Sequence, residues 1–252
     1  MKTTDNTILI TGGTSGIGLG LALRLHQAGN KVIITGRRKN LLDQIAADHP
    51  GIDTIVLDVT DPASIAHTRE TVTSTYPDVN VLVNNAGIML TENLGDPDSL
   101  PDALRIAEDT VTTNLLGPIR LVNALLSHLT GKDDAAIINV SSGLAFVPLP
   151  ATPTYNATKA AIHSFSESLR VQLADTSVRV IELVPPAVRT TLLGQQDDEW
   201  AMPLEDFLTE TMTLLQTQPD AKEILVEPVK FLRNAPSNGS YDKVLDLLSS
   251  SH

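Results

Sequence analysis

A chain of 252 residues is long enough for one α/β domain with a large core, so a single domain spanning 1–252 is expected. Hydrophobic residues make up 42% of the chain and charged residues 19%, which excludes a disordered protein. The 30 acidic and 18 basic residues give a net charge of -12, so the phosphates of a nucleic acid would be repelled and no nucleic-acid partner is expected.

The absence of cysteine excludes disulfides and thiol catalysis. Residues 1–7 are polar and lead directly into an apolar strand pattern, without the leader of a secreted protein. No later apolar run approaches the length that spans a membrane. The expected setting is therefore the cytoplasm, without membrane contact.

Short β-branched apolar runs alternate with longer amphipathic stretches up to residue 184. The predicted strands are 7–11, 31–35, 53–57, 79–84, 135–141 and 178–184. The predicted helices are 16–28, 39–47, 61–75, 101–129 and 155–174. This repeated strand–helix–strand alternation predicts an α/β fold with a doubly wound parallel sheet and helices on both faces.

The alternation stops after Pro185-Pro186. Residues 187–219 mix prolines, acidic residues and the single tryptophan around a helical stretch, which is typical of an insertion that covers a cleft. Residues 221–234 are expected to be helical with a break at Pro228, and 241–248 form a short apolar tail.

A glycine-rich turn directly follows the first predicted strand, where missing side chains let backbone N–H groups and a helix N-terminus approach a pyrophosphate. The candidate phosphate-binding residues are Gly12, Thr14, Ser15, Gly16, Ile17 and Gly18. The alternative is a tight turn with a purely structural role. Its place in the first strand–helix unit of a parallel sheet favours a dinucleotide.

Arg37 and Arg38 follow the second strand, where an NAD-binding protein would carry an acidic residue for the adenosine ribose. Two guanidinium groups at this place favour a 2′-phosphate and hence NADP(H), with NAD(H) as the second choice. The alternative is a solvated basic start to the next helix.

Tyr155 and Lys159 lie four residues apart on one predicted helix, so the ammonium is expected near the phenol. A nearby cation lowers the pKa of a phenol from about 10, which favours proton exchange near neutral pH. Ser142 follows the strand 135–141, and its hydroxyl is expected to share a substrate oxygen with the phenol. The alternatives are a solvated helix face for the pair and a turn cap for the serine.

Taken in order, the glycine turn, Asn84-Asn85-Ala86-Gly87, Asn114, Ser142 and Tyr155-x-x-x-Lys159 resemble the pattern of the short-chain dehydrogenase/reductase family over residues 7–190. Segments 141–148 and 184–191 resemble its DltE-like branch. The resemblance implies a Rossmann-like domain and an oxidoreductase that exchanges a hydride between a nicotinamide and a carbonyl or secondary alcohol.

The resemblance also implies individual roles. Tyr155 is the general acid in reduction and the base in oxidation, Lys159 binds the nicotinamide ribose and tunes Tyr155, and Ser142 orients the carbonyl. Asn114 holds a proton-relay water. Further cofactor contacts are implied at Asp58, Val59, Asn85, Ala86, Gly87, Pro185, Val188 and Thr190. No metal is required, and the six histidines are scattered, with His163 expected in packing or at an interface.

The sequence departs from the family pattern in two places. Pro186 stands where glycine is common, which stiffens the floor of the nicotinamide pocket and removes an N–H, although activity is expected to survive. The C-terminal part lacks the usual glycine-rich strand and offers 239–242 instead. Six strands are therefore expected, and a seventh is left open.

Two other classes of function compete with the enzyme hypothesis. A cofactor-binding sensor on the same fold would tolerate the loss of Tyr155, whereas the enzyme needs Ser142, Tyr155 and Lys159 together, and all three are present. The sequence contains no basic tail, repeat or low-complexity arm that would favour a scaffold protein. The enzyme is therefore favoured.

A small-molecule pocket is expected between 144–154 and 187–203. Its predicted apolar lining is Phe146, Leu149, Leu192, Leu193, Trp200 and Met202, for which core packing is the alternative. A homodimer or homotetramer is expected through the two long helices. The residues predicted to pair there are Leu115, Leu121, Ile162, Phe165 and Leu169.

Overall fold

The computed structural model describes residues 2–250; Met1 and the last two residues of the expected domain, Ser251 and His252, lie outside the described residues. Seven parallel strands form one sheet in the order β3-β2-β1-β4-β5-β6-β7. The strands are β1 (Thr7–Ile10), β2 (Lys31–Gly36), β3 (Ile52–Val56), β4 (Val79–Asn84), β5 (Ala136–Val140), β6 (Arg179–Val184) and β7 (Glu223–Leu225). Their β-branched and leucine side chains fill the core on both faces, as parallel strands require.

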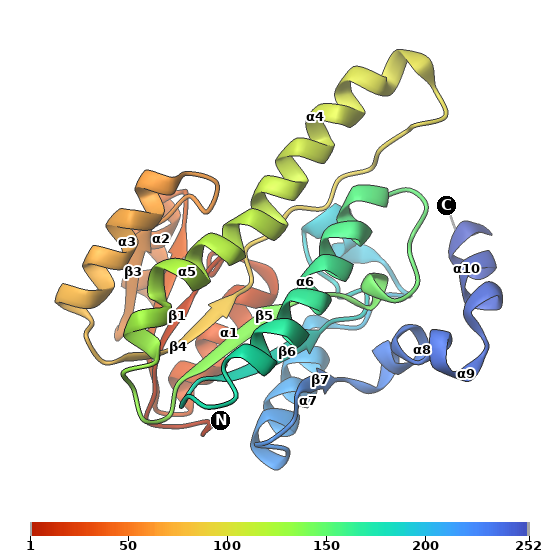
Figure 1. Ribbon diagram of the computed structural model, residues 1–252. Helices are drawn as coiled ribbons and strands as arrows, with labels where there is room; N and C mark the ends of the chain where they lie inside the picture. The colour runs from red at the N-terminus through yellow and green to blue at the C-terminus, as the bar shows by residue number, and fades with distance from the viewer. Residues whose placement is uncertain (1, 251–252) are drawn as a thin grey trace.

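Helices cover both faces of the sheet (Figure 1). On one face, α1 (Gly16–Gln27), α2 (Lys39–Asp48) and α7 (Leu204–Thr217) enclose one apolar cluster. On the other face, α3 (Pro62–Thr75), α5 (Gly117–Leu129) and α6 (Pro153–Gln172) enclose a second cluster. The predicted doubly wound architecture is thus confirmed.

The strand order reverses at β1, which pairs with β2 on one side and β4 on the other. In an open parallel sheet, the crevice at such a reversal lies outside the carboxyl ends of the strands and is the usual ligand site. The glycine turn follows β1, and Asn85, Ala86 and Gly87 follow β4. Both segments therefore reach the same crevice.

The seventh strand lies in a place where the sequence predicted helix. β7 (Glu223–Leu225) extends the sheet beside β6 within the stretch 221–234, and Ile224 is buried in the core. The helical prediction holds only after Pro228, for α8 (Lys230–Arg233); α9 (Ala235–Asn238) follows beyond the predicted stretch. The stretch 239–242 forms no strand, because Gly239 ends α9 in a left-handed conformation and Tyr241 begins α10 (Tyr241–Ser250).

The predicted helix 101–129 is broken in the middle. α4 (Leu100–Val111) and α5 are joined by one π-helical turn, Thr112–Leu116. A π turn inserts an extra residue into the helical repeat and often marks a functional position. Here its only fully buried residue is Asn114, which it turns towards β4 and its following loop.

The chain between β6 and β7 divides into a surface loop and a core helix. Val188 pairs with Met202 in an isolated parallel bridge, and Arg189 donates to the carbonyls of Asp198, Glu199 and Ala201, which holds the loop together. α7 then packs against α1, with Phe207 completely buried. Among residues 2–250, no helix combines the length and apolar character needed to cross a membrane.

Candidate active site

The glycine turn between β1 and α1 has no room for side chains. Gly12 and Gly16 have φ of 66° and 53°, which favour glycine. A Cβ on Gly18 would lie 2.3 Å from the carbonyl oxygen of Gly12, and a Cβ on Gly12 would lie 2.8 Å from Cα of Ala86. Ser15, at the N-cap of α1, makes no side-chain cap bond, which leaves the helix N-terminus open to an anion.

Asn85 and Ala86 hold this turn in place. The Asn85 side-chain amide donates to the carbonyls of Thr11 and Gly12 at 2.9 and 3.2 Å. The backbone N–H groups of Asn85 and Ala86 donate to the hydroxyl of Thr11, both at 3.0 Å. The segment after β4 therefore has a structural role in tying two strand ends together. Thr11 was not among the predicted site residues, although its place at the end of β1 marks it.

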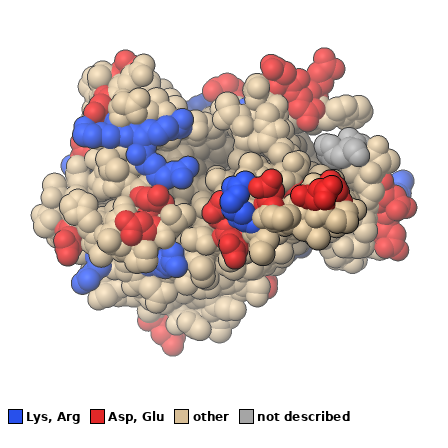
Figure 2. Space-filling model, turned by 90° about the horizontal axis from the view of Figure 1, so that it is seen from above, with Lys and Arg blue, Asp and Glu red and all other residues tan. Residues whose placement is uncertain are grey.

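Arg37 and Arg38 are exposed at the end of β2. The Arg38 guanidinium lies 3.4 Å from the hydroxyl of Thr14 in the glycine turn. Figure 2 looks onto this end of the molecule and shows Lys and Arg side chains gathered on one side of a hollow, with acidic groups mostly on the opposite side. The gathering of basic side chains next to β2 favours the binding of an anionic ligand there.

Asp58, after β3, is oriented by Thr60. Its Oδ1 accepts hydrogen bonds from the N–H and the hydroxyl of Thr60 at 2.9 and 2.7 Å. Burial raises the pKa of Asp58, but these two hydrogen bonds and the charge of Arg37 outweigh it, so that the pKa lies below its ordinary value. The carboxylate is therefore an ionised acceptor at neutral pH. Val59 beside it is buried against Gly117.

Ser142, Tyr155, Lys159 and Asn114 are brought together at the carboxyl end of β5, and all are at least nine-tenths buried. The hydroxyl of Ser142 acts on the phenol of Tyr155 and lowers its pKa. The Ser142 hydroxyl accepts from the N–H of Leu144 at 3.1 Å, which is the turn cap given as the alternative; that Ser142 shares a substrate oxygen with the phenol remains a prediction. The Lys159 ammonium donates to the carbonyl of Val140 at 2.8 Å.

Asn114 holds one backbone residue with both ends of its amide and also reaches the Thr158 hydroxyl on α6, at 3.5 Å. Its Oδ1 accepts from the N–H of Ile88, and its Nδ2 donates to the carbonyl of the same residue, both at 2.8 Å. A Cβ on Gly87 would lie 3.3 Å from Asn114 Oδ1. Asn114 therefore fixes the loop after β4 next to Lys159. The water predicted at Asn114 remains a prediction.

Burial dominates the titration of the two central groups. It raises the pKa of Tyr155 to about 12, against a lowering by the Ser142 hydroxyl. It lowers the pKa of Lys159 to about 8, against a raising by the charge of Glu182. The expectation that the ammonium brings the phenol towards neutrality is wrong for this state: Lys159 Nζ lies 5.5 Å from the ring centroid and points to Val140 instead.

Tyr155 lies in a small apolar cluster. Tyr155 packs with Met89 and Leu149, and partly buried side chains close the cluster: Leu144, Ala151, Leu192, Leu193 and Leu248. Of the residues predicted to line the pocket, Leu149, Leu192 and Leu193 lie in this cluster, where they pack beside Tyr155; that they contact a substrate remains a prediction. The predicted lining is wrong for Trp200, which is 98% exposed, while Phe146 and Met202 pack on the main core. Leu248 was missed because its contact depends on how α10 returns to the site.

The segment after β6 lies against both halves of the site. The carbonyl of Pro185 accepts from the N–H of Gly143 at 2.9 Å, next to Ser142. Thr190 lies beside the glycine turn, where a Cβ on Gly16 would be 3.4 Å from its methyl group. Val188 is buried between these two points. Pro186 has no backbone N–H to donate, and the segment makes these contacts through Pro185 and Thr190 on either side of it.

Glu92 is a third residue near the site, after Thr11 and Leu248, that sequence analysis missed. Its carboxylate accepts from the N–H and the hydroxyl of Thr154 at 3.0 and 2.7 Å, one residue before Tyr155. The Glu92 N–H donates to the carbonyl of Ala151. The loop after β4 is thereby tied to the first turn of α6. No local pattern in the sequence marks this contact, which joins residues 62 apart.

The fold and the site together define a dinucleotide-binding α/β protein with a buried Ser-Tyr-Lys cluster. The family model described as short chain dehydrogenase matches residues 6–201. The oxidoreductase DltE of Bacillus subtilis is 40% identical over 252 residues, which cover 99% of this chain and 98% of that protein. The chain belongs to the short-chain dehydrogenase/reductase family and is an oxidoreductase of that type, as the sequence predicted.

Solved structures agree on the fold. A short chain dehydrogenase from Burkholderia cenocepacia in complex with NADP aligns with a TM-score of 0.82, at 24% identity, over 97% of this chain and 99% of that chain. At this identity the likeness shows the fold alone. The 3-ketoacyl-(acyl-carrier-protein) reductase of Brucella melitensis, complexed with NADH, aligns with a TM-score of 0.75 at 27% identity, over 86% and 93% of the two chains.

Proposed function

We propose that this protein is an NADP(H)-dependent oxidoreductase that interconverts a carbonyl compound and a secondary alcohol. The observation that carries the proposal is the meeting of Tyr155, Ser142 and Lys159 at the end of β5, beside the open glycine turn. The solved relatives that hold NADP and NADH support a nicotinamide cofactor. The exposed Arg37 and Arg38 at the end of β2 support the phosphorylated form.

The residues present fit such a cofactor. The glycine turn and the open N-terminus of α1 suit a pyrophosphate, Asp58 and Val59 lie at the end of β3, and Thr190 and Val188 reach the turn from the other side. Lys159 is the cation nearest to the phenol of Tyr155 in the described part of the chain. When bound, a nicotinamide supplies or accepts the hydride.

Tyr155 holds the proton of the reaction. Because burial raises the pKa of its phenol to about 12, the hydroxyl is protonated at neutral pH and suits the role of donor to the oxygen of a carbonyl that is being reduced. Ser142, whose hydroxyl acts on the same phenol, positions the same oxygen. The apolar cluster around Tyr155 excludes water and favours a substrate with an apolar body.

Two further parts of the proposal concern the setting. We propose that the enzyme works in the cytoplasm, which cell fractionation tests, and that it forms a homodimer or homotetramer. Of the residues expected at the interface, Leu121, Ile162 and Leu169 are buried in the core of this chain and are not available for pairing. Leu104 on α4 and Val171 on α6 are apolar and exposed, which supports an interface formed by the same two helices but through other faces of them.

The test compares the wild type with Tyr155→Phe. NADPH and NADH are titrated by the fluorescence of the reduced nicotinamide, and NADPH oxidation is then followed with a panel of ketones and aldehydes. The wild type is expected to reduce at least one carbonyl, and Tyr155→Phe to bind NADPH as well but react about 10²–10⁴ times more slowly. Cofactor binding without any turnover would favour the sensor, and no cofactor binding would contradict both functions.

A further inference from the structure

A row of polar side chains crosses the sheet beneath α6. Asn84, Asn139, Glu182 and Glu223 are register partners on the neighbouring strands β4, β5, β6 and β7. Two residues earlier on β4, β5 and β6, the same face carries the apolar core under α5 and α6. The row therefore marks the level at which that core ends and the site begins.

The members of this row differ in how they are satisfied. The Asn84 amide donates to Asn139 Oδ1 at 2.9 Å, and the Asn139 amide donates to the hydroxyl of Ser166 at 2.9 Å. Glu182 is 0% exposed; its Oε2 lies 2.8 Å from Nδ1 of His163, and its Oε1 has no hydrogen-bond partner among the described residues. Glu182 is thus a buried carboxylate with unused capacity to accept.

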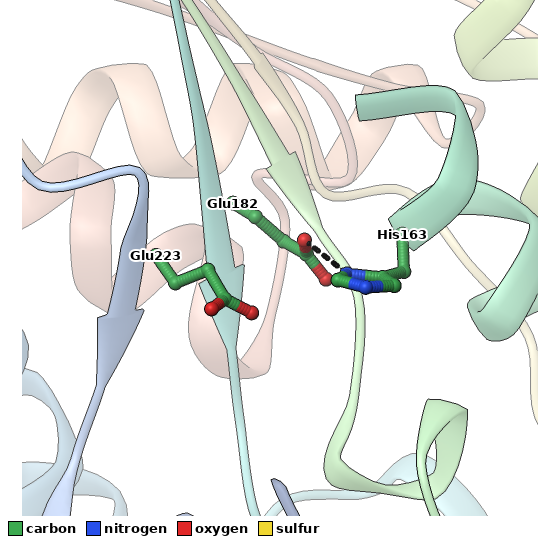
Figure 3. A group of neighbouring side chains, drawn as sticks. All are labelled: His163, Glu182 and Glu223. Carbon is green, nitrogen blue, oxygen red and sulfur yellow. Dashed lines mark hydrogen bonds and ion pairs between the residues drawn. The ribbon is translucent and has the colours of Figure 1, made fainter. Parts of the chain in front are cut away.

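His163, Glu182 and Glu223 converge from α6, β6 and β7 (Figure 3), and their ligand atoms lie within 4.8 Å of one another. The spacing invites a metal ion, but a fork of Arg233 already donates to both oxygens of Glu223 at 2.8 and 2.9 Å. The Phe146 ring lies 4.4 Å from the same guanidinium. Arg233 therefore supplies the positive charge that a metal would bring, and it neutralises Glu223.

Arg233 is paired with Glu223, which raises the pKa of Arg233, and the charge of Glu182 also raises it. Glu182 itself makes no ion pair with Arg233 and is held instead by His163 of α6. Lys159 and His163 are one turn apart on the sheet-facing side of that helix, and Lys159 donates to the carbonyl of Val140. Val140 is the register partner of Leu183, the residue after Glu182. The Lys159 ammonium is thus held at the end of β5, on the strand next to β6, and His163, one turn further along the same helix, holds Glu182.

The other groups around Lys159 leave Glu182 as its counter-charge. From α6 it faces the phenol of Tyr155, which burial keeps protonated, and it lines a narrow polar space together with the uncharged amides of Asn84, Asn114 and Asn139. Burial lowers the pKa of Lys159 to about 8, and the charge of Glu182 is the effect that raises it.

We propose that Glu182 is a positioning residue for the reaction proposed above: held by His163, its buried carboxylate keeps the Lys159 ammonium charged before cofactor and substrate bind. Glu182 acts through Lys159 and touches neither cofactor nor substrate. The inference rests on the proposed function for its purpose, but the electrostatic coupling that it states belongs to the protein alone.

The experiment titrates Lys159 by NMR in protein that carries ¹³C- and ¹⁵N-labelled lysine, without cofactor or substrate. The Lys159 signal is assigned by its loss in Lys159→Arg. In Glu182→Gln, the midpoint of the Lys159 titration is expected to fall by about one pH unit or more, because the opposite charge that favours the ammonium is gone. The matched control is Glu167→Gln, since Glu167 Oε2 lies 3.9 Å from the other nitrogen of His163 but on an exposed side chain.

An unchanged midpoint in Glu182→Gln, or an equal fall in Glu167→Gln, would overturn the proposal. If Glu182→Gln does not fold, Glu182→Asp gives the same decision, because it keeps the charge and withdraws it by one methylene: a smaller fall supports the proposal and none overturns it. The titration needs no turnover, so its failure is separate from a failure of the proposed reaction. Where a carbonyl substrate is found, the alkaline limb of kcat should move with the midpoint.

Discussion

Burial acts in opposite directions on the two titrating side chains of the site, because in each case it disfavours the charged form. It raises the pKa of Tyr155 to about 12 and lowers that of Lys159 to about 8. At neutral pH the phenol is therefore a proton donor, while the buried ammonium still carries its charge. Keeping the charged ammonium buried lowers the free energy of unfolding.

Lys159→Met is predicted to stabilise the protein at pH 7. The unfolded chain holds the lysine proton up to about pH 10.5 and the folded chain only up to about 8, so the buried charge costs about 3 kcal/mol below pH 8. Part of this gain is offset by the lost bond to Val140. Thermal unfolding at pH 7 should show Tm higher by about 4 °C.

The advantage of Lys159→Met should shrink as the pH rises from 8 and vanish above 10.5, where both states of the wild type have lost the proton. Lys243→Met, at an exposed position of α10, is the matched control and should leave Tm nearly unchanged. A gain that is the same at pH 7 and pH 10.5 would show that packing, rather than the charge, causes it.

Cofactor choice is predicted to depend on the arginines after β2. Arg37→Ser and Arg38→Ser each remove a guanidinium that is suited to a 2′-phosphate, and a hydrogen bond to a charged group contributes about 1.5–3 kcal/mol. The Kd for NADPH should rise about 10-fold or more, with the Kd for NADH unchanged, in a fluorescence titration. Arg105→Ser, exposed on α4, is the control. Equal losses for both cofactors would contradict the assignment.

Among the elements, the turn between β1 and α1 depends most on its glycines. Gly18→Ala is predicted to destabilise the protein by about 2 kcal/mol or more and to abolish NADPH binding, because the new Cβ would meet the backbone oxygen of Gly12 at 2.3 Å. Gly95→Ala is the matched control, since its Cβ would have only an ordinary contact at 3.6 Å. Thermal unfolding and cofactor titration measure both effects, and a Gly18→Ala protein that binds NADPH normally would refute the steric argument.

Other elements depended on distant partners that no local pattern reveals. Glu223–Leu225 is a strand because β6 offers an open edge beside it, whereas its short sequence is compatible with the helical pattern of 221–234. The break between α4 and α5 has a similar cause: the amide of Asn114 pairs with both backbone groups of Ile88, which fixes a π turn in a stretch whose periodicity predicts one helix.

At the scale of the whole molecule, charge and apolar surface are unevenly distributed. The chain carries a net charge of -12, yet basic side chains gather beside the hollow seen in Figure 2. Such a local positive region attracts an anionic cofactor while the rest of the surface repels polyanions. In the described residues of a single chain, apolar side chains on α4 and α6 remain exposed to solvent, and this exposure is the basis of the oligomer prediction.

Leu104→Asp and Val171→Asp are predicted to weaken the oligomer, because an interface core disfavours an unpaired charge. Leu104 is 63% exposed and Val171 77% exposed, so neither substitution disturbs the core. Light scattering after size-exclusion chromatography should show a smaller mass than for the wild type. Val56→Asp, at the opposite edge of the sheet, should leave the mass unchanged. A wild type that is monomeric would contradict the prediction directly.

The amino-acid sequence by itself determined the parallel sheet, the dinucleotide-binding turn and the family. These features depend on short-range patterns: apolar runs with period two or 3.6, glycines after a strand, and a tyrosine and lysine one helical turn apart. Each pattern lies within a short stretch of consecutive residues, so it can be recognised without any knowledge of distant contacts.

Only the tertiary structure decided the ionisation of Tyr155 and Lys159, the members of the apolar cluster around Tyr155 and the place of β7. Burial depends on which segments return to cover a group: Leu248 reaches the cluster of Tyr155 from the far end of the chain, and the charge of Glu182 acts on Lys159 from β6. Spacing on one helix placed the ammonium near the phenol, but the surroundings of both groups set their pKa values, because the free energy of a buried charge depends on everything packed around it.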